Sequence, residues 1–189
     1  MTAADPTQDE DLMLAYRDGD VQAFDTLYAR HRGALYRYLL RQCGIAAVAE
    51  ELFQDVWMNL IRARERYEPR AKFTTYLFRL AHNRLIDHYR RQAAGVPLSY
   101  DDDPDDPLID SLVATTPGPA EQAALRADAE RLLTLIGELP EAQREALLLR
   151  EEGGLSLVEI AEATAVNVET AKSRLRYAVA KLKRDMEVD

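Results

Sequence analysis

Residues 155–184 have the sequence LSLVEIAEATAVNVETAKSRLRYAVAKLKR. Ser156 followed three residues later by Glu159 forms a capping box, so a helix is predicted to begin there. Its apolar spacing ends at Thr164, and Asn167 can then cap a second helix that continues to the end of this stretch. A short helix, a short turn and a longer basic helix are typical of a helix-turn-helix motif.

The second of these helices is predicted to have two distinct faces. Its apolar residues are expected to pack on the preceding helices: Ala171, Leu175, Ala178, Val179 and Leu182. Polar residues follow at helical spacing on another face: Glu169, Lys172, Ser173 and Arg176. Lysine and arginine donate to guanine edges or phosphates, and glutamate accepts from a cytosine amino group. We interpret this stripe as a surface that reads duplex DNA in the major groove. The alternative is a solvated helix whose basic end suits its dipole.

The distribution of charge favours nucleic-acid binding although the whole 189-residue chain has a net charge of −9. Residues 62–91 carry nine Lys/Arg against three Asp/Glu, and residues 170–184 carry six bases and no acid. Residues 121–169, in contrast, carry four bases and eleven acids. Salt screens exposed charges beyond a Debye length of about 8–10 Å, so a local basic block can contact phosphate in an acidic chain.

The apolar pattern predicts an all-α fold. Apolar residues recur at intervals of three and four over residues 12–89 and 125–182, with breaks expected at Gly19, Gly44 and Pro69. No segment alternates in the manner of a strand. There is no apolar run of about 18 residues and no apolar secretory signal, so we expect a cytoplasmic protein without membrane insertion.

The segment between the two helical regions is predicted to be a linker. Residues 92–120 contain five prolines and six aspartates, which disfavour regular structure and repel one another. We therefore expect two small helical domains, residues 1–92 and 121–189, joined by an extended acidic linker over residues 93–120. The second would be a helix-turn-helix domain, similar to a winged helix without strands, opened by a helix at residues 119–137. The linker would be either merely solvated or bound in a basic channel of a partner, and it would hold the two basic surfaces apart.

Residues 73–91 interleave aromatic and basic side chains. Aromatic rings stack on unpaired bases at about 1–3 kcal/mol each while arginines hold the backbone, so this composition suits single-stranded DNA. Four apolar residues are expected in the core of the domain: Phe73, Leu77, Leu80 and Leu85. An exposed stripe would offer donors and acceptors to a base edge: Tyr76, Asn83, Asp87 and Arg90.

The sequence does not predict catalysis, a metal site or a cofactor. His82 and His88 are six residues apart and share no helix face, whereas helical metal ligands usually stand three or four apart. The single cysteine, Cys43, is expected to be a small buried apolar side chain. We find no glycine-rich phosphate loop, no nucleophile elbow and no pair of carboxylates with catalytic spacing.

Taken together, these segments resemble the extracytoplasmic-function (ECF) sigma factors of bacterial RNA polymerase, in the sigma-70 superfamily. Three segments are similar to the promoter-melting domain of that family: residues 19–28, 49–57 and 73–91. Three more are similar to its helix-turn-helix domain: residues 139–140, 154–161 and 170–175. Their order and spacing together carry the resemblance, which covers nearly the whole chain outside the linker and the first ten residues.

The resemblance implies three sets of contacts. The β′ clamp helices of core RNA polymerase would be bound by Glu50, Glu51, Gln54 and Asp55. The unpaired strand of the promoter −10 element would be bound by Arg70, Lys72, Phe73, Tyr76, Asn83, Arg84, Asp87, His88 and Arg91. The −35 duplex would be bound by Ser156, Glu169, Thr170, Lys172, Ser173, Arg174 and Arg176. The implied partners are core RNA polymerase, through its clamp helices and β flap, promoter DNA, and an anti-sigma factor.

Four positions depart from the family pattern, and one of them is Tyr76, which stands where tryptophan is usual. Val48 replaces a commonly acidic residue of the clamp-binding segment, and Glu169 replaces a common glycine. Ala165 stands where the turn often has glycine, and a left-handed alanine would be strained by about 1 kcal/mol.

Two other classes of protein remain as alternatives to a sigma factor. A one-component or response-regulator-type helix-turn-helix transcription factor would require a ligand pocket or phosphoacceptor domain in the first half. A helical protein-interaction adaptor would leave both basic blocks unexplained.

Overall fold

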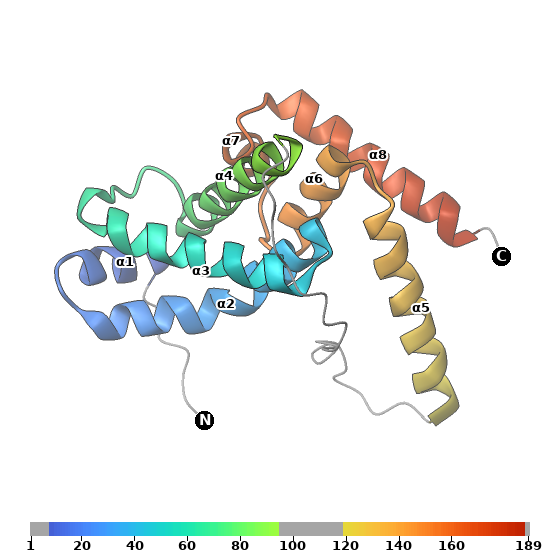
Figure 1. Cartoon of the computed structure of the whole chain (residues 1–189), viewed down its shortest axis with the longest axis horizontal. Coiled ribbons are helices and arrows are strands. Elements are labelled where there is room, and N and C mark those ends of the chain that lie inside the picture. The colour runs from blue at the N-terminus through green and yellow to red at the C-terminus, as the bar shows by residue number, and fades with distance from the viewer. Residues whose placement is uncertain (1–7, 95–118, 188–189) are drawn as a thin grey trace.

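The computed structural model describes residues 8–94 and 119–187, with side chains from residue 126 onward in the second segment. These residues form α-helices and one 3-10 helix, with no strand among them, which confirms the all-α prediction (Figure 1). The predicted linker lies, apart from its ends, outside the described residues. In chain order the elements are α1 (Asp9–Arg17), α2 (Val21–Cys43), α3 (Ala46–Ala63), η1 (Arg64–Arg66), α4 (Phe73–Ala93), α5 (Pro119–Gly137), α6 (Glu141–Glu151), α7 (Leu157–Ala163) and α8 (Val168–Glu187).

Local sequence signals account for most helix ends. The Asp20 carboxylate caps α2 by accepting from the backbone N–H groups of Gln22 and Ala23 at 3.0 and 3.3 Å. Gly44 ends the same helix in the left-handed region at φ 74°, which glycine adopts without a Cβ clash. Pro69 does not itself end α3, because the α-helix already stops at Ala63 and tightens into the 3-10 turn.

Helices α1 to α4 form an N-terminal lobe (residues 8–94) around a large aromatic core. The Trp57 indole lies edge-on to Phe24, with ring centroids 5.7 Å apart, and 5.0 Å from the ring of Tyr28. Four residues of α4 were expected in the core. Phe73, Leu77 and Leu85 are fully buried, and Leu80 is half-buried.

Helices α5 to α8 form a C-terminal lobe (residues 119–187) in which α8 packs on α6 and α7. Ala171 and Ala178 of α8 are fully buried, and their small side chains let the helices approach closely. Val179, expected on the packed face, is 36% exposed. It lies 100° around the helix from Ala178, and a helix that rests on two short neighbours buries only a narrow stripe.

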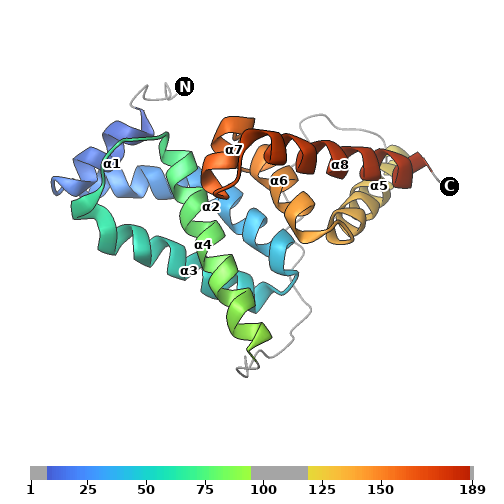
Figure 2. The same ribbon diagram turned by 90° about the horizontal axis from the view of Figure 1, so that it is seen from above.

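The two lobes are packed against each other. Helix α4 contacts α7, and α2 contacts α6, as the view from above shows (Figure 2). The Phe78 ring of α4 is 1% exposed and lies against Gly153, where an added Cβ would be 3.2 Å from Phe78 Cε2 and 2.8 Å from the Leu149 carbonyl oxygen. The expectation that the basic surfaces are held apart is therefore wrong for this structure.

Two smaller expectations concern Cys43 and membrane insertion. Cys43 is half-buried rather than fully buried, its Sγ donates to the Leu39 carbonyl at 3.1 Å, and burial raises the pKa of its thiol. Among the helices of the described segments, none has the length and apolar character needed to cross a membrane.

Candidate nucleic-acid interface

The helix-turn-helix begins with the predicted capping box. The Ser156 backbone N–H donates to Glu159 Oε2 at 2.7 Å, and the Glu159 N–H donates to Ser156 Oγ at 3.3 Å. The carboxylate also meets the Nζ of Lys72, the residue just before α4, at 2.9 Å. The Ser156 N–H first, and then the Lys72 ammonium, lower the pKa of Glu159 to about 2. Ser156, predicted to contact the −35 duplex, therefore uses its N–H as a donor and its hydroxyl oxygen as an acceptor to begin α7.

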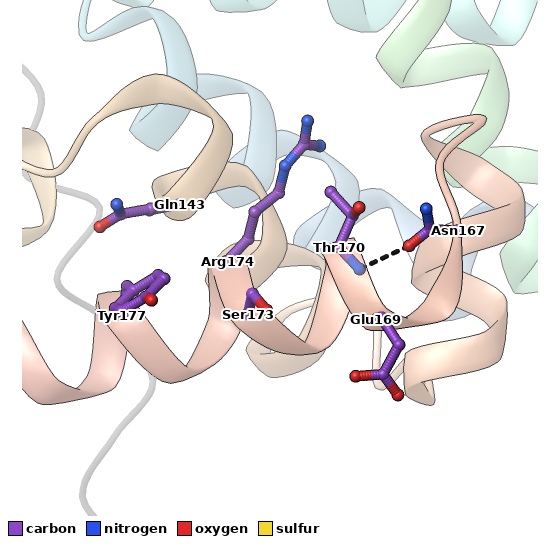
Figure 3. A pocket seen from close by; sticks show the side chains of 7 residues that line it. All are labelled: Gln143, Asn167, Glu169, Thr170, Ser173, Arg174 and Tyr177. Carbon is purple, nitrogen blue, oxygen red and sulfur yellow. Dashed lines mark hydrogen bonds between the residues drawn. The ribbon is translucent and has the colours of Figure 1, made fainter.

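The turn between α7 and α8 has the predicted strain and the predicted cap. Ala165 has φ 53°, the left-handed conformation that disfavours residues with a Cβ. The Asn167 side-chain oxygen accepts from the Thr170 N–H at 2.7 Å and so begins α8 (Figure 3). These two features fix the direction in which α8 leaves the turn.

The outer face of α8 presents its polar stripe to solvent. Glu169, Lys172 and Arg176 are exposed, with Lys172 Nζ 3.9 Å from Glu169 Oε1. The Arg176 guanidinium lies 5.1 Å from the centroid of the exposed Tyr177 ring. Three further predicted residues are half-buried beside an open pocket on this helix: Thr170, Ser173 and Arg174 (Figure 3). The arrangement suits groove binding, because cationic and hydrogen-bonding groups project together from the first turns of one helix.

The predicted −10 residues of α4 differ in how far they are exposed. Asn83 and Arg91 are exposed, whereas Arg84 and Asp87 are half-buried and 3.8 Å apart. The Tyr76 ring is half-buried, with its centroid 5.3 Å from that of Tyr67. Asn83 and Arg91, together with Arg90, are among the exposed polar residues of this helix.

Two residues that the resemblance placed in the −10 set are buried in this structure. Phe73 is 0% exposed, with its ring centroid 5.2 Å from that of His31, and it belongs to the core. His88 is 5% exposed, and burial first and then the charge of Arg91 lower the pKa of its imidazole. Neither side chain offers DNA an accessible ring here, because the apolar face of α4 extends over both positions.

The loop before α4 is held by contacts to α1 and to α7 of the other lobe. The Phe73 backbone N–H donates to Glu10 Oε1 of α1 at 2.5 Å, so a carboxylate from another helix caps α4. Arg70 is exposed and pairs with Glu68 across the turn, with Nε 2.7 Å from Oε2. Lys72 is exposed as well but is directed to Glu159 of the other lobe.

The predicted polymerase-binding residues gather on one side of α3. Glu50, Glu51 and Gln54 are exposed, and Asp55 is half-buried. Val48, read from the sequence as a departure on this surface, is 1% exposed and lies in the core. Val48 therefore packs in the core of the lobe and is not itself exposed on the acidic face of α3.

Sequence reasoning missed a buried polar cluster between the lobes. Glu145 of α6 is 9% exposed, accepts from the Tyr38 hydroxyl at 3.0 Å and lies 2.6 Å from His82 Nδ1. The available signal was its place in the run Glu145 to Leu149, where it is the only charged residue among four apolar ones. A carboxylate embedded in an apolar stripe needs a partner.

Comparison with known proteins decides between the alternatives left open by the sequence. The family model described as Sigma-70 region 2 matches residues 27–95, and the model described as Sigma-70, region 4 matches residues 129–182. The ECF RNA polymerase sigma factor SigK of Mycobacterium sp. (strain KMS) is 31% identical over 181 residues, covering 94% of this chain and 90% of the relative. The chain belongs to the ECF family of RNA polymerase sigma factors.

Other sigma factors match this chain over most of its length. The RNA polymerase sigma factor CnrH of Cupriavidus metallidurans is 29% identical over 186 residues, covering 96% of this chain and 97% of the relative. A solved structure of CnrH in complex with the cytosolic domain of CnrY has a TM-score of 0.68 at 25% identity, covering 96% of this chain and 98% of CnrH. The Bartonella quintana sigma factor RpoE, solved with the anti-sigma factor NepR, has the same fold with a TM-score of 0.67 at 20% identity, over 88% of this chain and 98% of that one. The sigma-factor fold predicted from the sequence is thereby confirmed.

Proposed function

We propose that this sigma factor directs core RNA polymerase to specific promoters by binding the −35 duplex with α8 and an unpaired −10 strand with α4 and its preceding loop. The observation that carries the proposal is the exposed stripe of Glu169, Lys172 and Arg176 at the start of a helix whose entry is fixed by caps. Such a stripe supplies the donors and acceptors that discriminate base edges in the major groove. Arg70, Asn83 and Arg91 supply comparable groups beside α4.

The polymerase itself would be bound by the acidic face of α3. Glu50, Glu51 and Gln54 lie on the exposed side of that helix, away from the core residue Val48. In this proposal residues 1–92 bind polymerase and the −10 element, residues 121–189 bind the −35 element, and residues 93–120 connect them. The protein would act in the cytoplasm.

We further propose that an anti-sigma factor regulates the protein. The supporting observation is that CnrH, which matches nearly the whole chain, was solved with a bound protein partner, the cytosolic domain of CnrY. Co-purification of the tagged chain with a partner that blocks transcription in vitro would test this proposal.

Run-off transcription with purified core polymerase tests the main proposal. We expect specific transcripts only when this chain is added, and their loss when the −35 sequence is scrambled. A variant with Lys172→Ala and Arg176→Ala provides a matched protein control. If the chain binds promoter DNA but core polymerase starts no transcript, the function belongs to the other class of helix-turn-helix regulators.

A further inference from the structure

The start of α4 is capped from a distant part of the chain. Lys72 occupies its N-cap position, and an ammonium group has only donors to offer. Helix starts are usually capped by Ser, Thr, Asp or Asn, whose side-chain oxygens accept from N–H groups that have no partner inside the helix. Here the acceptor is Glu10 of α1, with Oε1 2.5 Å from the Phe73 nitrogen and 63 positions earlier in the chain. The first turn of α4 therefore depends on α1 for its cap.

Glu10 is itself held in place by the contacts of its neighbour Asp9. The Asp9 carboxylate lies 2.7 Å from Arg30 Nη1 and 2.7 Å from His31 Nε2, both on α2. The His31 ring in turn lies 5.2 Å from the ring of Phe73, between centroids. Two adjacent carboxylates thus connect α1 to α2 and to the first residue of α4. Phe73 is held through its backbone by α1 and through its ring by α2.

Glu10 also acts on the other end of the loop between η1 and α4. That loop, residues 67–72, begins at Tyr67, which is 4% exposed. Burial first, and then the nearby Glu10 carboxylate, raise the pKa of the Tyr67 hydroxyl to about 12. Helix α1 contacts η1 as well as α4 (Figure 2). The loop is therefore anchored against α1 at both of its ends.

Between these anchors the loop carries two exposed cations, Arg70 and Lys72, which the proposed function assigns to the −10 strand. A loop that becomes ordered only on binding loses conformational freedom, and this loss weakens the complex. A loop whose ends are already fixed loses less and so binds more tightly. A carboxylate that fixes the loop can therefore strengthen strand binding although it lies behind the loop, on its α1 side.

We propose that Glu10 is a positioning residue for the −10 strand, because its carboxylate caps α4 and orders the loop that carries Arg70 and Lys72. This inference rests on the proposed function of that loop. Glu10 binds the Phe73 N–H rather than DNA, so its effect on the strand passes through the loop. Helix α1 thereby takes part in promoter binding without contributing a DNA contact of its own.

Fluorescence anisotropy with the full chain bound to core polymerase tests this role. One probe is a single-stranded oligonucleotide with the −10 sequence of a promoter mapped by run-off transcription, and the other is the −35 duplex of that promoter. Glu10→Ala should weaken strand binding about twofold to fivefold, as expected for a lost helix cap, and leave duplex binding unchanged. Glu10→Gln, which keeps an acceptor oxygen, should lose less. Asp11→Ala is the matched control, because Asp11 is an exposed acid of the same helical turn.

A cap supplied by α4 itself gives a second test. Lys72→Ser places a capping hydroxyl at the N-cap position, whereas Lys72→Ala removes the same cation without adding a cap. Glu10→Ala should therefore cost less strand affinity in the Lys72→Ser background than in the Lys72→Ala background. Hydrogen exchange of the amides of residues 68–76 should follow the same order, fastest where both caps are missing. Equal costs in the two backgrounds would mean that Glu10 does not act as a cap.

The outcomes separate this inference from the proposed function. A wild-type complex that does not bind the −10 strand would overturn the proposed function together with the inference that rests on it. Wild-type binding that Glu10→Ala leaves unchanged would overturn the positioning role alone. An equal loss on the strand and on the −35 duplex would also overturn it, because Glu10 would then only stabilise the fold.

Discussion

The basic blocks at residues 62–91 and 170–184 carry the same net charge of +6 but lie in different surroundings. In the first block Lys72 and Arg79 face carboxylates of the opposite lobe. In the second, Lys172 has an acid of its own helix, Glu169, as its nearest described ionic partner. The charge of a segment therefore predicts a capacity to bind phosphate, whereas tertiary packing determines whether that capacity is accessible.

The largest effect is expected at the acidic face of α3, which belongs to neither basic block. Replacing Glu50 and Asp55 by lysine should abolish core-polymerase binding if this face meets a basic clamp surface, since each like-charge contact costs several kcal/mol. Co-elution on size exclusion measures it. Asp25→Lys with Glu65→Lys is the control, because both acids are exposed in the same lobe. Unchanged co-elution of the first variant would place the polymerase surface elsewhere.

The contact between the lobes can be weakened from its apolar side. Phe78 is 1% exposed and meets Tyr38 edge-on at a centroid distance of 5.2 Å. Phe78→Ala should lower the free energy of unfolding by about 3–5 kcal/mol, the usual cost of truncating a buried phenylalanine. Urea unfolding followed by circular dichroism measures the loss. Leu80→Ala, at a half-buried position of the same helix, should lose less than half as much. Equal losses would mean that Phe78 is not enclosed by both lobes.

The accessible basic block predicts a sequence-dependent effect. Lys172→Ala and Arg176→Ala should each weaken binding to the cognate −35 duplex by about 1–3 kcal/mol if they touch base edges. Fluorescence anisotropy with cognate and scrambled duplexes measures this discrimination. Lys183→Ala, exposed further along α8, is the control. An equal loss on both duplexes would show that the two residues hold phosphate only.

Features governed by neighbouring residues were predictable from the sequence. The capping box at Ser156 and the cap at Asn167 each depend on a few adjacent residues, and each is found where it was predicted. The limits of α5 follow from Pro119 and Gly137 in the same way. Such signals are reliable because the groups that satisfy a helix end are only two or three residues away. The left-handed turn at Ala165 was implied by the family resemblance instead.

Features that depend on distant packing were not predictable. His88 was placed in the −10 set by resemblance, yet the core of the N-terminal lobe covers it, whereas the burial of Phe73, in the same set, follows the apolar spacing. Val48 was treated as part of a docking surface and is also in the core. The contact of Glu145 with Tyr38 joins residues 107 positions apart, so the apolar run around Glu145 shows that it needs a partner but does not identify that partner. Apolar periodicity shows that a helix has a buried face but does not say what will cover it.

The smallest effect concerns Glu159, which both caps α7 and pairs with Lys72 across the lobes. Its pKa is lowered from near 4.5 to about 2, so its charged form stabilises the fold above pH 4.5, and this contribution is lost as the pH falls toward 2. Glu159→Ala should therefore cost about 1 kcal/mol at pH 7, the usual value of a helix cap, and the difference from wild type should shrink toward pH 2. Urea unfolding at pH 7, 4 and 2.5 measures this profile.

Lys72→Ala separates the two roles of Glu159. It leaves the capping box in place and removes only an ion pair whose lysine side chain is 71% exposed. An exposed pair of this kind is worth less than about 1 kcal/mol, so the loss should be clearly smaller than for Glu159→Ala. If the two variants lose the same stability, the carboxylate acts mainly through the opposite lobe. Lys72, in the basic block at residues 62–91, would then be held by a stronger contact than the exposure of its side chain suggests.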